Sequence, residues 1–202
     1  MFLPFFYFAL IVRVYKYAVS QIILMLLYYT VAHDTLTAVL VLDKKGVLYY
    51  AGVGHNSDQL VADAVAAYKN KPQTLLKMAE ITPKMQYTIN TYMAMVRDPR
   101  LIDDLNKKIP MYLGGTVLQK RVWTYLVNRT TCQSTTTYGE IAANLNIPRS
   151  SRAVGACCGS NKIALAIPCH RVVSKLGKLT GYRWGVEIKR TLLALEKLVA
   201  TH

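Results

Sequence analysis

Two adjacent residues in the last fifth of the chain carry side chains suited to nucleophilic chemistry. Cys169 and His170 follow Pro168 at the end of an apolar, strand-like run in residues 161–171, NKIALAIPCHR. A cysteine attacks as its thiolate, a minor species at neutral pH, so an imidazole that accepts the proton would activate it. Neighbouring residues of a strand point to opposite faces, so the pair can cooperate only if the chain turns here or a water bridges them. The alternative is a buried structural cysteine beside a hydrogen-bonded core histidine.

Helices are predicted ahead of this segment by two capping boxes, in which a threonine and a residue three positions later satisfy each other's backbone N–H groups. Apolar residues at helical spacing follow both boxes. The first predicts a helix from residue 117, and the second a helix of two turns from residue 138. The boxes are formed by Thr116 with Gln119 and by Thr137 with Glu140.

A third helix is expected over residues 151–158, with Ser150 as its cap. The turn of residues 146–149 joins it to the helix before it, and two short helices joined in this way are typical of a helix-turn-helix. Its small residues would let the backbone approach a DNA groove, while Arg152 projects at its start. A tightly packed core helix with one solvated arginine is the alternative.

Basic residues are concentrated in the same part of the chain. Residues 115–202 carry 13 Lys and Arg against 3 Asp and Glu, whereas residues 1–114 carry 12 against 8. A field of this sign attracts polyanions, of which nucleic acid is the commonest, although an anionic membrane or a merely solvated basic face remain alternatives.

The four cysteines, Cys132, Cys157, Cys158 and Cys169, form no CxxC pair, and two of them are adjacent. Adjacent cysteines do not easily meet disulfide geometry. This spacing indicates a reducing compartment rather than a disulfide scaffold. None of the four histidines forms a ligand-like pair with them, so no metal site is predicted.

Two motifs at the end of the chain carry a family resemblance. IPCHRVV at 167–173 and GYRWGVEIKRTLLALE at 181–196 resemble the active-site signature of the O6-alkylguanine-DNA alkyltransferases, or methylated-DNA–protein-cysteine methyltransferases. The resemblance continues upstream through SNKIALA, SRAVGAC, TYGEIAANL and GTVLQKRVW, and is strong over roughly residues 112–198. It implies direct-reversal repair, in which a methyl or larger alkyl group moves irreversibly from O6 of guanine, or O4 of thymine, to the protein. One turnover per molecule and no cofactor are implied.

The resemblance also assigns catalytic roles. Cys169 would accept the alkyl group, His170 would activate it through a water, and Glu196 would orient His170. Asn161 would shape the turn that presents the cysteine, and Tyr182 would line the guanine pocket and donate a proton to the leaving base.

Contacts with double-stranded DNA that contains the lesion are assigned in the same way. Arg152 would enter the base stack and hold the place of the extruded guanine, and Tyr138 would crowd the phosphate that must rotate. Further DNA contacts are expected from Ser151, Thr137 and Ala153, and the substrate pocket is expected to include Val172, Arg183 and Cys158. The protein is expected to be a monomer with no obligatory protein partner.

The last helix contains both apolar and charged residues. Glu196 lies between leucines in an otherwise apolar stretch, which favours a partly buried position. Glu187 and Lys189 are expected to be surface charges, because such residues are mostly exposed. Trp184 is expected in the core.

The N-terminal half has a different pattern. Short β-branched and aromatic runs after residue 25, two of them joined by a turn at residues 43–46, predict a three-stranded antiparallel sheet. A helix is expected over Ser57 to Tyr68, and residues 70–110, with three prolines, are expected to be a variable connection. The predicted domains are therefore a ribonuclease-H-like α/β unit over 26–110 and a mainly α, winged-helix-like unit over 111–202.

Residues 1–25 hold all four phenylalanines of the chain, in an apolar run too short to span a bilayer. The first basic residue follows this run, unlike the order in a secretory signal. We expect that translation begins at Met25 and that the extension is not native, with a membrane anchor as the alternative. The expected location is the nucleus in a eukaryote and the cytoplasm otherwise.

Three other functions fit parts of this pattern. A relative that binds alkylated DNA without repairing it would lack the acceptor, yet Cys169 is present. A DNA-binding regulator that uses Cys169 as a sensor would need an effector domain, which 202 residues do not display. A cysteine hydrolase would turn over repeatedly, so catalysis beyond one equivalent would identify it.

Overall fold

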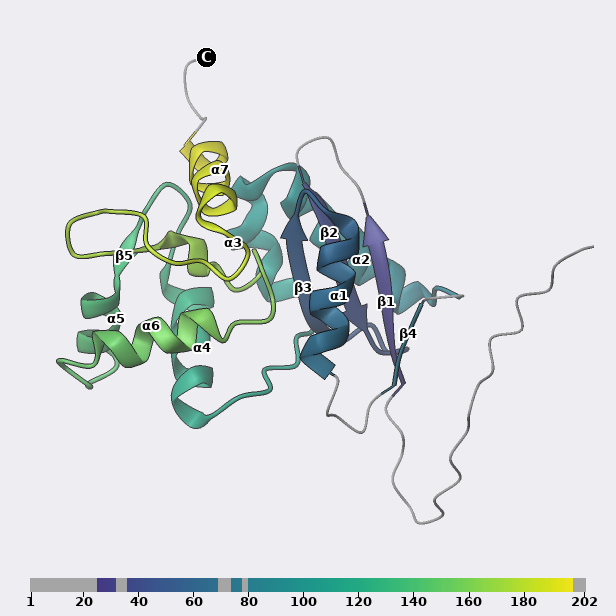
Figure 1. The fold of residues 1–202 in the computed structure, drawn as a ribbon, viewed down its shortest axis with the longest axis horizontal. Helices are drawn as coiled ribbons and strands as arrows, with labels where there is room; N and C mark the ends of the chain where they lie inside the picture. Colours follow the sequence, from purple (N-terminus) through teal and green to yellow (C-terminus); the bar gives the residue numbers. More distant parts are fainter. Residues whose placement is uncertain (1–24, 32–35, 69–73, 78–79, 198–202) are drawn as a thin grey trace, which may run out of the picture.

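The structure is a computed structural model that describes residues 25–31, 36–68, 74–77 and 80–197 (Figure 1). The expectations for the apolar N-terminal extension concern residues outside these ranges, apart from Met25 itself. Within the described ranges, no helix is both long enough and apolar enough to cross a membrane.

A mixed sheet of four strands, in the order β3-β2-β1-β4, forms one side of the molecule. β1 (Met25–Val31), β2 (Thr37–Leu42) and β3 (Leu48–Gly54) are antiparallel neighbours, as predicted. The prediction of three strands was incomplete, because β4 (Thr74–Lys77) adds to β1 in parallel. Its four residues are too few to give a clear alternation in the sequence.

The predicted turn between β2 and β3 is confirmed. Asp43 accepts hydrogen bonds at Oδ1 from the backbone N–H groups of Lys45 (2.8 Å) and Val47 (3.0 Å). Gly46 has φ +79°, a left-handed conformation that glycine adopts at little cost. The tight turn fixes the register of the two strands.

Two helices cover opposite faces of this sheet (Figure 1). α1 (Ser57–Tyr68) begins after Asn56, whose Oδ1 accepts from Gln59 N, and it packs on Val39 and Val41. α2 (Pro83–Arg97) packs on the alternate residues of the same strand, with Ile89, Tyr92 and Met93 facing Ala38, Leu40 and Leu42. The period of two along β2 therefore divides the core into two layers.

The prediction of a connection over residues 70–110 was wrong. This region holds α2, then the short helices η1 (Pro99–Leu101), α3 (Ile102–Leu105) and η2 (Asn106–Lys108). Pro83 occupies the first turn of α2, where its missing N–H costs nothing, and Thr82 accepts a hydrogen bond from Met85 N. The proline marks the start of a helix rather than an interruption.

The C-terminal half is mainly helical. Both predicted capping boxes are present, at the starts of α4 (Val117–Arg129) and α5 (Tyr138–Asn144). α6 (Ser151–Gly159) begins as predicted, but the Ser150 side chain makes no capping hydrogen bond. The remaining elements are β5 (Thr136–Thr137), η3 (Cys169–Arg171), β6 (Val172–Val173), which pairs with β5 in parallel, and α7 (Val186–Lys197).

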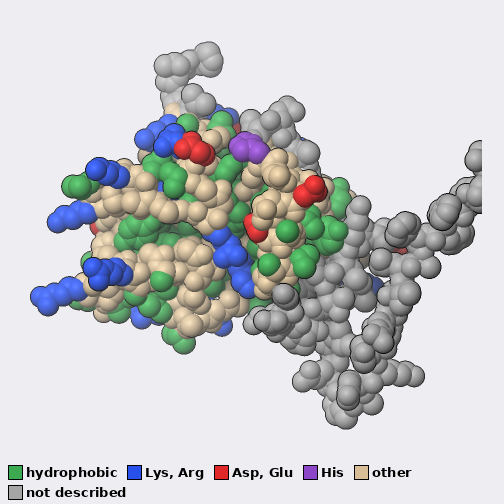
Figure 2. Space-filling model, viewed as in Figure 1, with side chains coloured by type: hydrophobic (Ala, Val, Ile, Leu, Met, Phe, Trp, Pro, Cys, Tyr) green, Lys and Arg blue, Asp and Glu red, His purple; other side chains and the backbone are tan. Residues whose placement is uncertain are grey.

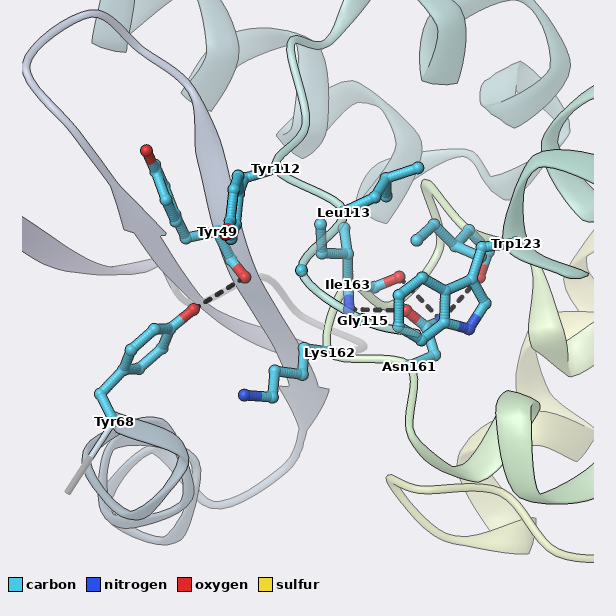
Figure 3. Close-up of a pocket in the computed structure, with 11 residues that line it drawn as sticks. Tyr49, Tyr68, Tyr112, Leu113, Gly115, Trp123, Asn161, Lys162 and Ile163 are labelled. Atoms are coloured by element: carbon cyan, nitrogen blue, oxygen red, sulfur yellow. Dashed lines mark hydrogen bonds between the residues drawn. The ribbon is translucent and has the colours of Figure 1, made fainter. Parts of the chain in front are cut away.

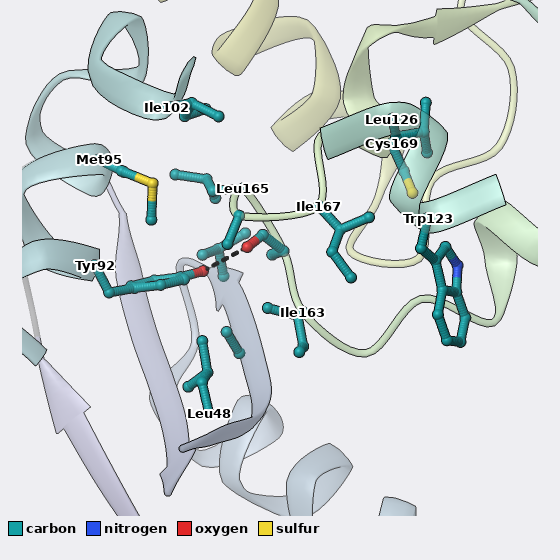
Figure 4. Close-up of a cluster of buried hydrophobic side chains, with 14 of the residues drawn as sticks. Leu48, Tyr92, Met95, Ile102, Trp123, Leu126, Ile163, Leu165, Ile167 and Cys169 are labelled. Carbon is teal, nitrogen blue, oxygen red and sulfur yellow. Dashed lines mark hydrogen bonds between the residues drawn. The ribbon is translucent and has the colours of Figure 1, made fainter. Parts of the chain in front are cut away.

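One buried cluster joins the two halves. In Figure 4 it extends from Leu48 and Tyr92 on the sheet side to Trp123 and Cys169 on the helical side. Tyr92 on α2 donates a hydrogen bond from its hydroxyl to the Ala164 carbonyl (3.0 Å). The sheet and its helices thus support the segment that leads to Cys169.

Candidate active site

The segment between α6 and Cys169 is a folded loop rather than the strand-like run that its apolar sequence indicated. It pairs with β3 at one point only, where Ala51 N donates to Lys162 O and Ala164 N donates to Ala51 O, both at 2.8 Å. Leu165 then adopts φ +56°, which is rare for a residue with a side chain. The burial of residues 163–167 at 2% exposure or less holds this conformation in place.

A single buried amide organises this loop. Asn161 Nδ2 donates to the carbonyls of Ile163 and Ile167, each at 3.1 Å, and lies 3.3 Å from Cys169 Sγ. Its Oδ1 accepts from Ile163 N at 2.8 Å. The side chain therefore links the start of the loop to its end and reaches the sulfur itself.

The thiol of Cys169 is almost entirely enclosed, at 3% exposure, in the 3-10 turn η3. The turn that cooperation with His170 requires is thus present at Pro168. Burial raises the pKa of the Cys169 thiol well above its ordinary value, the neighbouring Cys158 thiol adds to the increase, and the Asn161 amide acts against it. The resting group is a neutral thiol, and its use as a nucleophile requires a proton acceptor.

His170 and Glu196 form a buried pair behind the cysteine. His170 Nε2 lies 2.7 Å from Glu196 Oε1, and both side chains are at most 1% exposed. Burial lowers the pKa of His170 despite the opposing effect of Glu196, so the ring is neutral. Within the described part of the chain, His170 Nδ1 is buried and has no hydrogen-bond partner. This nitrogen is free to accept a proton.

Arg171 completes a charge network around Glu196. Its Nε donates to both carboxylate oxygens at 3.1 and 3.2 Å, and its Nη1 donates to Asp103 Oδ1 at 2.6 Å. Burial alone would raise the pKa of Glu196, but the hydrogen bonds of His170 and Arg171 and the charge of the Arg171 guanidinium outweigh it and lower the pKa. Glu196 is therefore ionised and fixed in place.

A cavity of about 280 Å³ opens above the sulfur. Tyr182 forms one wall, with its ring 6.4 Å from the His170 ring and 5.1 Å from Trp184, both edge-on. Burial raises the pKa of Tyr182 well above its ordinary value, and its hydroxyl has no partner among the described residues. The other lining residues are Tyr138, Gly155, Cys158, Gly159, Cys169, Gly181 and Arg183.

Three of the eight predicted pocket and DNA-contact residues line this cavity. Cys158 and Arg183 line it, whereas Val172 is fully buried and does not. Tyr138 lines the rim, and its hydroxyl lies 3.2 Å from Thr180 Oγ1. On the adjoining surface Arg152 is exposed in the first turn of α6, and Ser151, Ala153 and Thr137 are partly exposed.

The surface around the helix pair is basic. Figure 2 shows Lys and Arg side chains projecting from the end of the molecule that α5, α6 and the loop before α7 form. Exposed basic residues of these segments are Arg149, Arg152, Lys175, Lys178 and Arg183. Part of the excess positive charge of the C-terminal half thus lies on this surface.

Two residues of the site were missed or misplaced by sequence reasoning. Lys189 is fully buried rather than a surface charge, and its Nζ donates to the carbonyls of Val172 and Thr180. Its spacing of three and seven residues from Leu192 and Glu196 on α7 was the available signal. Asp103, which binds Arg171, comes from the region that was expected to be a connection, and no pattern in the sequence pointed to it. The expectation for Glu187 is confirmed, since its side chain is 80% exposed.

Geometry first defines a class. A buried cysteine backed by an imidazole and a carboxylate opens into a cavity beside a basic helix pair, which is the arrangement of a cysteine-dependent protein that acts on DNA. Residues 117–198 match the family profile described as the DNA-binding domain of 6-O-methylguanine DNA methyltransferase. The methylated-DNA–protein-cysteine methyltransferase of Debaryomyces hansenii is 39% identical over 175 residues, which cover 85% of this chain and 91% of that protein.

Solved structures agree. A crystal structure of the Mycobacterium tuberculosis O6-methylguanine methyltransferase has a TM-score of 0.65 and 28% identity, covering 86% of this chain and 93% of that one. The same organism's OGT in complex with DNA has a TM-score of 0.64 and 28% identity, covering 85% and 92%. The chain belongs to the methylated-DNA–protein-cysteine methyltransferase family.

Proposed function

We propose that this protein repairs DNA by direct reversal, transferring a methyl or larger alkyl group from O6 of guanine to Cys169, once per molecule. The same transfer from O4 of thymine is part of the proposal. The observation that carries it is the Cys169 thiol, enclosed at the base of a 280 Å³ cavity with His170 and Glu196 behind it. The names of relatives that match over most of both chains support it.

Activation begins with proton transfer from the cysteine. The Cys169 thiol gives its proton, through one bridging water, to Nδ1 of neutral His170, which is buried and unpartnered in the described structure. Glu196 accepts from the other ring nitrogen, holds the tautomer and stabilises the imidazolium that forms. Asn161 donates to the sulfur at 3.3 Å and steadies the developing thiolate.

Transfer then forms an S–C bond and breaks the C–O6 bond. The bonding electron pair leaves with the guanine, which takes a proton from the Tyr182 hydroxyl as negative charge develops. The proton held by His170 returns through solvent to the tyrosinate, so the products are an S-alkylcysteine, neutral guanine and the original protonation states. A thioether has no leaving group that His170 could expel, and the reaction therefore stops at one equivalent.

The target base must leave the duplex to reach this cavity, at a cost of roughly a few kcal/mol. Arg152 would fill the vacated place in the stack, and Tyr138 would press on the phosphate. Ser151, Thr137 and Ala153 would contact the backbone. The exposure of Arg152 and the basic surface around it support this role.

The proposal extends to the organisation of the chain. Residues 26–110 would be a ribonuclease-H-like supporting domain, and residues 111–202 a winged-helix-like domain with α5 and α6 as its helix pair. The protein would act as a monomer without an obligatory protein partner, in the nucleus if the source is eukaryotic. Yeast relatives support the eukaryotic case.

Intact-protein mass after mixing with an oligonucleotide that carries O6-methylguanine tests the function. We expect a gain of one methyl per chain, mapped to the Cys169 peptide and limited to one equivalent. Cys169→Ala should bind the oligonucleotide without any gain. An unchanged mass of the native protein, with the lesion still bound, would reject transfer in favour of lesion sensing.

A further inference from the structure

A second cavity, of about 320 Å³, lies between the sheet and the helical half, apart from the pocket of Cys169 (Figure 3). Residues of β3, α1, the segment before α4, and the loop of Asn161 line it. Four aromatic rings contribute: Tyr49, Tyr68 and Tyr112 on one side and Trp123 on the other. Small-molecule sites are of this size, lie between domains and are lined mainly by apolar and aromatic groups.

The tyrosine side is held in place by its own contacts. The rings of Tyr49 and Tyr112 stack, with centroids 4.8 Å apart and planes 28° from parallel. The Tyr68 hydroxyl donates to the Tyr49 carbonyl at 3.0 Å. Tyr112 nevertheless remains 56% exposed, so part of its ring is accessible to a ligand.

Bare backbone forms the wall between the two sides. A Cβ at Gly114 would lie 2.7 Å from the Tyr112 ring, and one at Gly115 would lie 2.8 Å from the Trp123 ring. The rings therefore approach the peptide chain closely on both sides. Neither glycine N–H donates to any group in the part of the chain that the structure describes.

The electrostatics of this cavity favour a negative ligand. Lys162 lines it, with Nζ 5.2 Å from the centre of the Tyr68 ring and 3.3 Å from the Ala67 carbonyl. No Asp or Glu occurs among the described lining residues. An ammonium and two unused amide donors suit a small anion better than a cation.

We propose that this cavity binds a planar aromatic monoanion, such as an aromatic carboxylate, with its ring against the tyrosine side and its charge at Lys162. The proposal does not depend on the repair function. Its position gives it a connection to the reactive centre, because Asn161, Ile163 and Ile167 line the cavity and Asn161 also touches Cys169 Sγ.

Three probes that share one ring system test the proposal by calorimetric titration of the full chain: indole-3-acetate, the neutral indole-3-acetamide and the cationic tryptamine. We expect saturable one-to-one binding of the acetate, about tenfold tighter than the acetamide, with tryptamine weakest. Absence of saturable acetate binding, or equal affinity for the three probes, would overturn it.

Variants distinguish binding at this site from nonspecific binding to the protein surface. Lys162→Gln should remove the preference for acetate over acetamide, and Tyr112→Ala should weaken both by about tenfold or more. Tyr87→Ala, an equally exposed tyrosine (53%) outside the cavity, should bind as the native chain does. Urea titration of each variant reports whether it is folded, and its methyl transfer is measured separately. Native-like acetate binding by folded Tyr112→Ala would exclude this cavity as the site.

Discussion

The two ends of α7 each bury one charged side chain, and they do so in different ways. Glu196, near the C-terminus of the helix, accepts hydrogen bonds from the Arg171 guanidinium and from the imidazole of His170. Among the described residues, the hydrogen-bond partners of Lys189, in the first turn, are neutral carbonyls, those of Val172 and Thr180. Exposure is 1% or less for both.

Neither the position of Glu196 nor that of Lys189 stabilises α7 through the helix dipole. Helix dipoles stabilise anions at the N-terminus and cations at the C-terminus, and here both charges have the unfavourable arrangement. Their positions follow instead from what each one holds. Glu196 fixes His170 and Arg171, whereas Lys189 holds the loop that leads to Tyr182. One end of α7 therefore orders the groups next to Cys169, and the other end orders the loop beside the cavity.

The largest effect is expected from Glu196→Gln. The amide cannot stabilise an imidazolium as the carboxylate does, so the single-turnover rate of transfer should fall by about 100-fold or more. Rapid-quench measurement with excess protein over lesion oligonucleotide gives this rate. A decrease of less than threefold would show that the reaction does not use the His170–Glu196 pair.

Lys189→Met should act on stability rather than on chemistry. Two buried carbonyls lose their donor, and the free energy of unfolding should fall by about 2–4 kcal/mol. Urea titration measures the loss, while the transfer rate of the folded fraction should stay within a few-fold. Arg190→Gln, which changes an exposed neighbour on α7, is the matched control and should alter neither. A rate loss like that of Glu196→Gln would remove the distinction between the two ends.

Acid should weaken the reactive end in particular. Since burial lowers the pKa of His170, the unfolded chain takes up a proton that the folded protein resists, and stability falls as pH drops below about 6.5. Glu196, whose pKa is also lowered, extends this decline below the ordinary range of a carboxyl. Urea titrations from pH 7.5 to 5 should show a smaller decline for His170→Asn than for the native chain. Equal slopes would contradict the assignment.

The smallest effect is expected at the edge of the network. The Asp103 side chain is 29% exposed. When Asp103→Asn removes this carboxylate, Arg171 still has its ion pair with Glu196. We expect a loss of about 1 kcal/mol in unfolding free energy and less than a twofold change in rate. The same two assays measure it. A larger rate effect would show that the reactive centre includes Asp103 on α3.

Local structures could be predicted from the sequence because they depend on hydrogen bonds between residues that are close along the chain. The capping boxes at Thr116 and Thr137 and the turn at Asp43 each depend on residues at most four positions apart. Cys169 and its partners were predicted as site residues through a specific motif. The sequence predicted that these residues lie close together, and the distances between them come from the fold.

What the sequence could not display depends on distant contacts. Asp103 and Arg171 form an ion pair although they are 68 positions apart in the sequence. Residues 74–77 form strand β4 because they pair with the backbone of β1. The helix α2 had a local signal in the sequence, because Thr82 and Pro83 are typical of a helix start. The prolines of this region were instead interpreted as marks of a connection. For Lys189, the usual exposure of lysine was given more weight than the spacing on its helix.

The single bridge between Ala51 on β3 and the loop of residues 162–164 sets an order of assembly. Its partners lie more than a hundred positions apart, so the sheet leaves the ribosome long before the loop that docks on it. Contacts of such high sequence separation form slowly, because a long stretch of chain must first be closed. Until that docking, Cys169 lacks the enclosure that the folded loop gives it. We therefore expect the pocket of Cys169 to form late in folding, after the sheet that supports its loop.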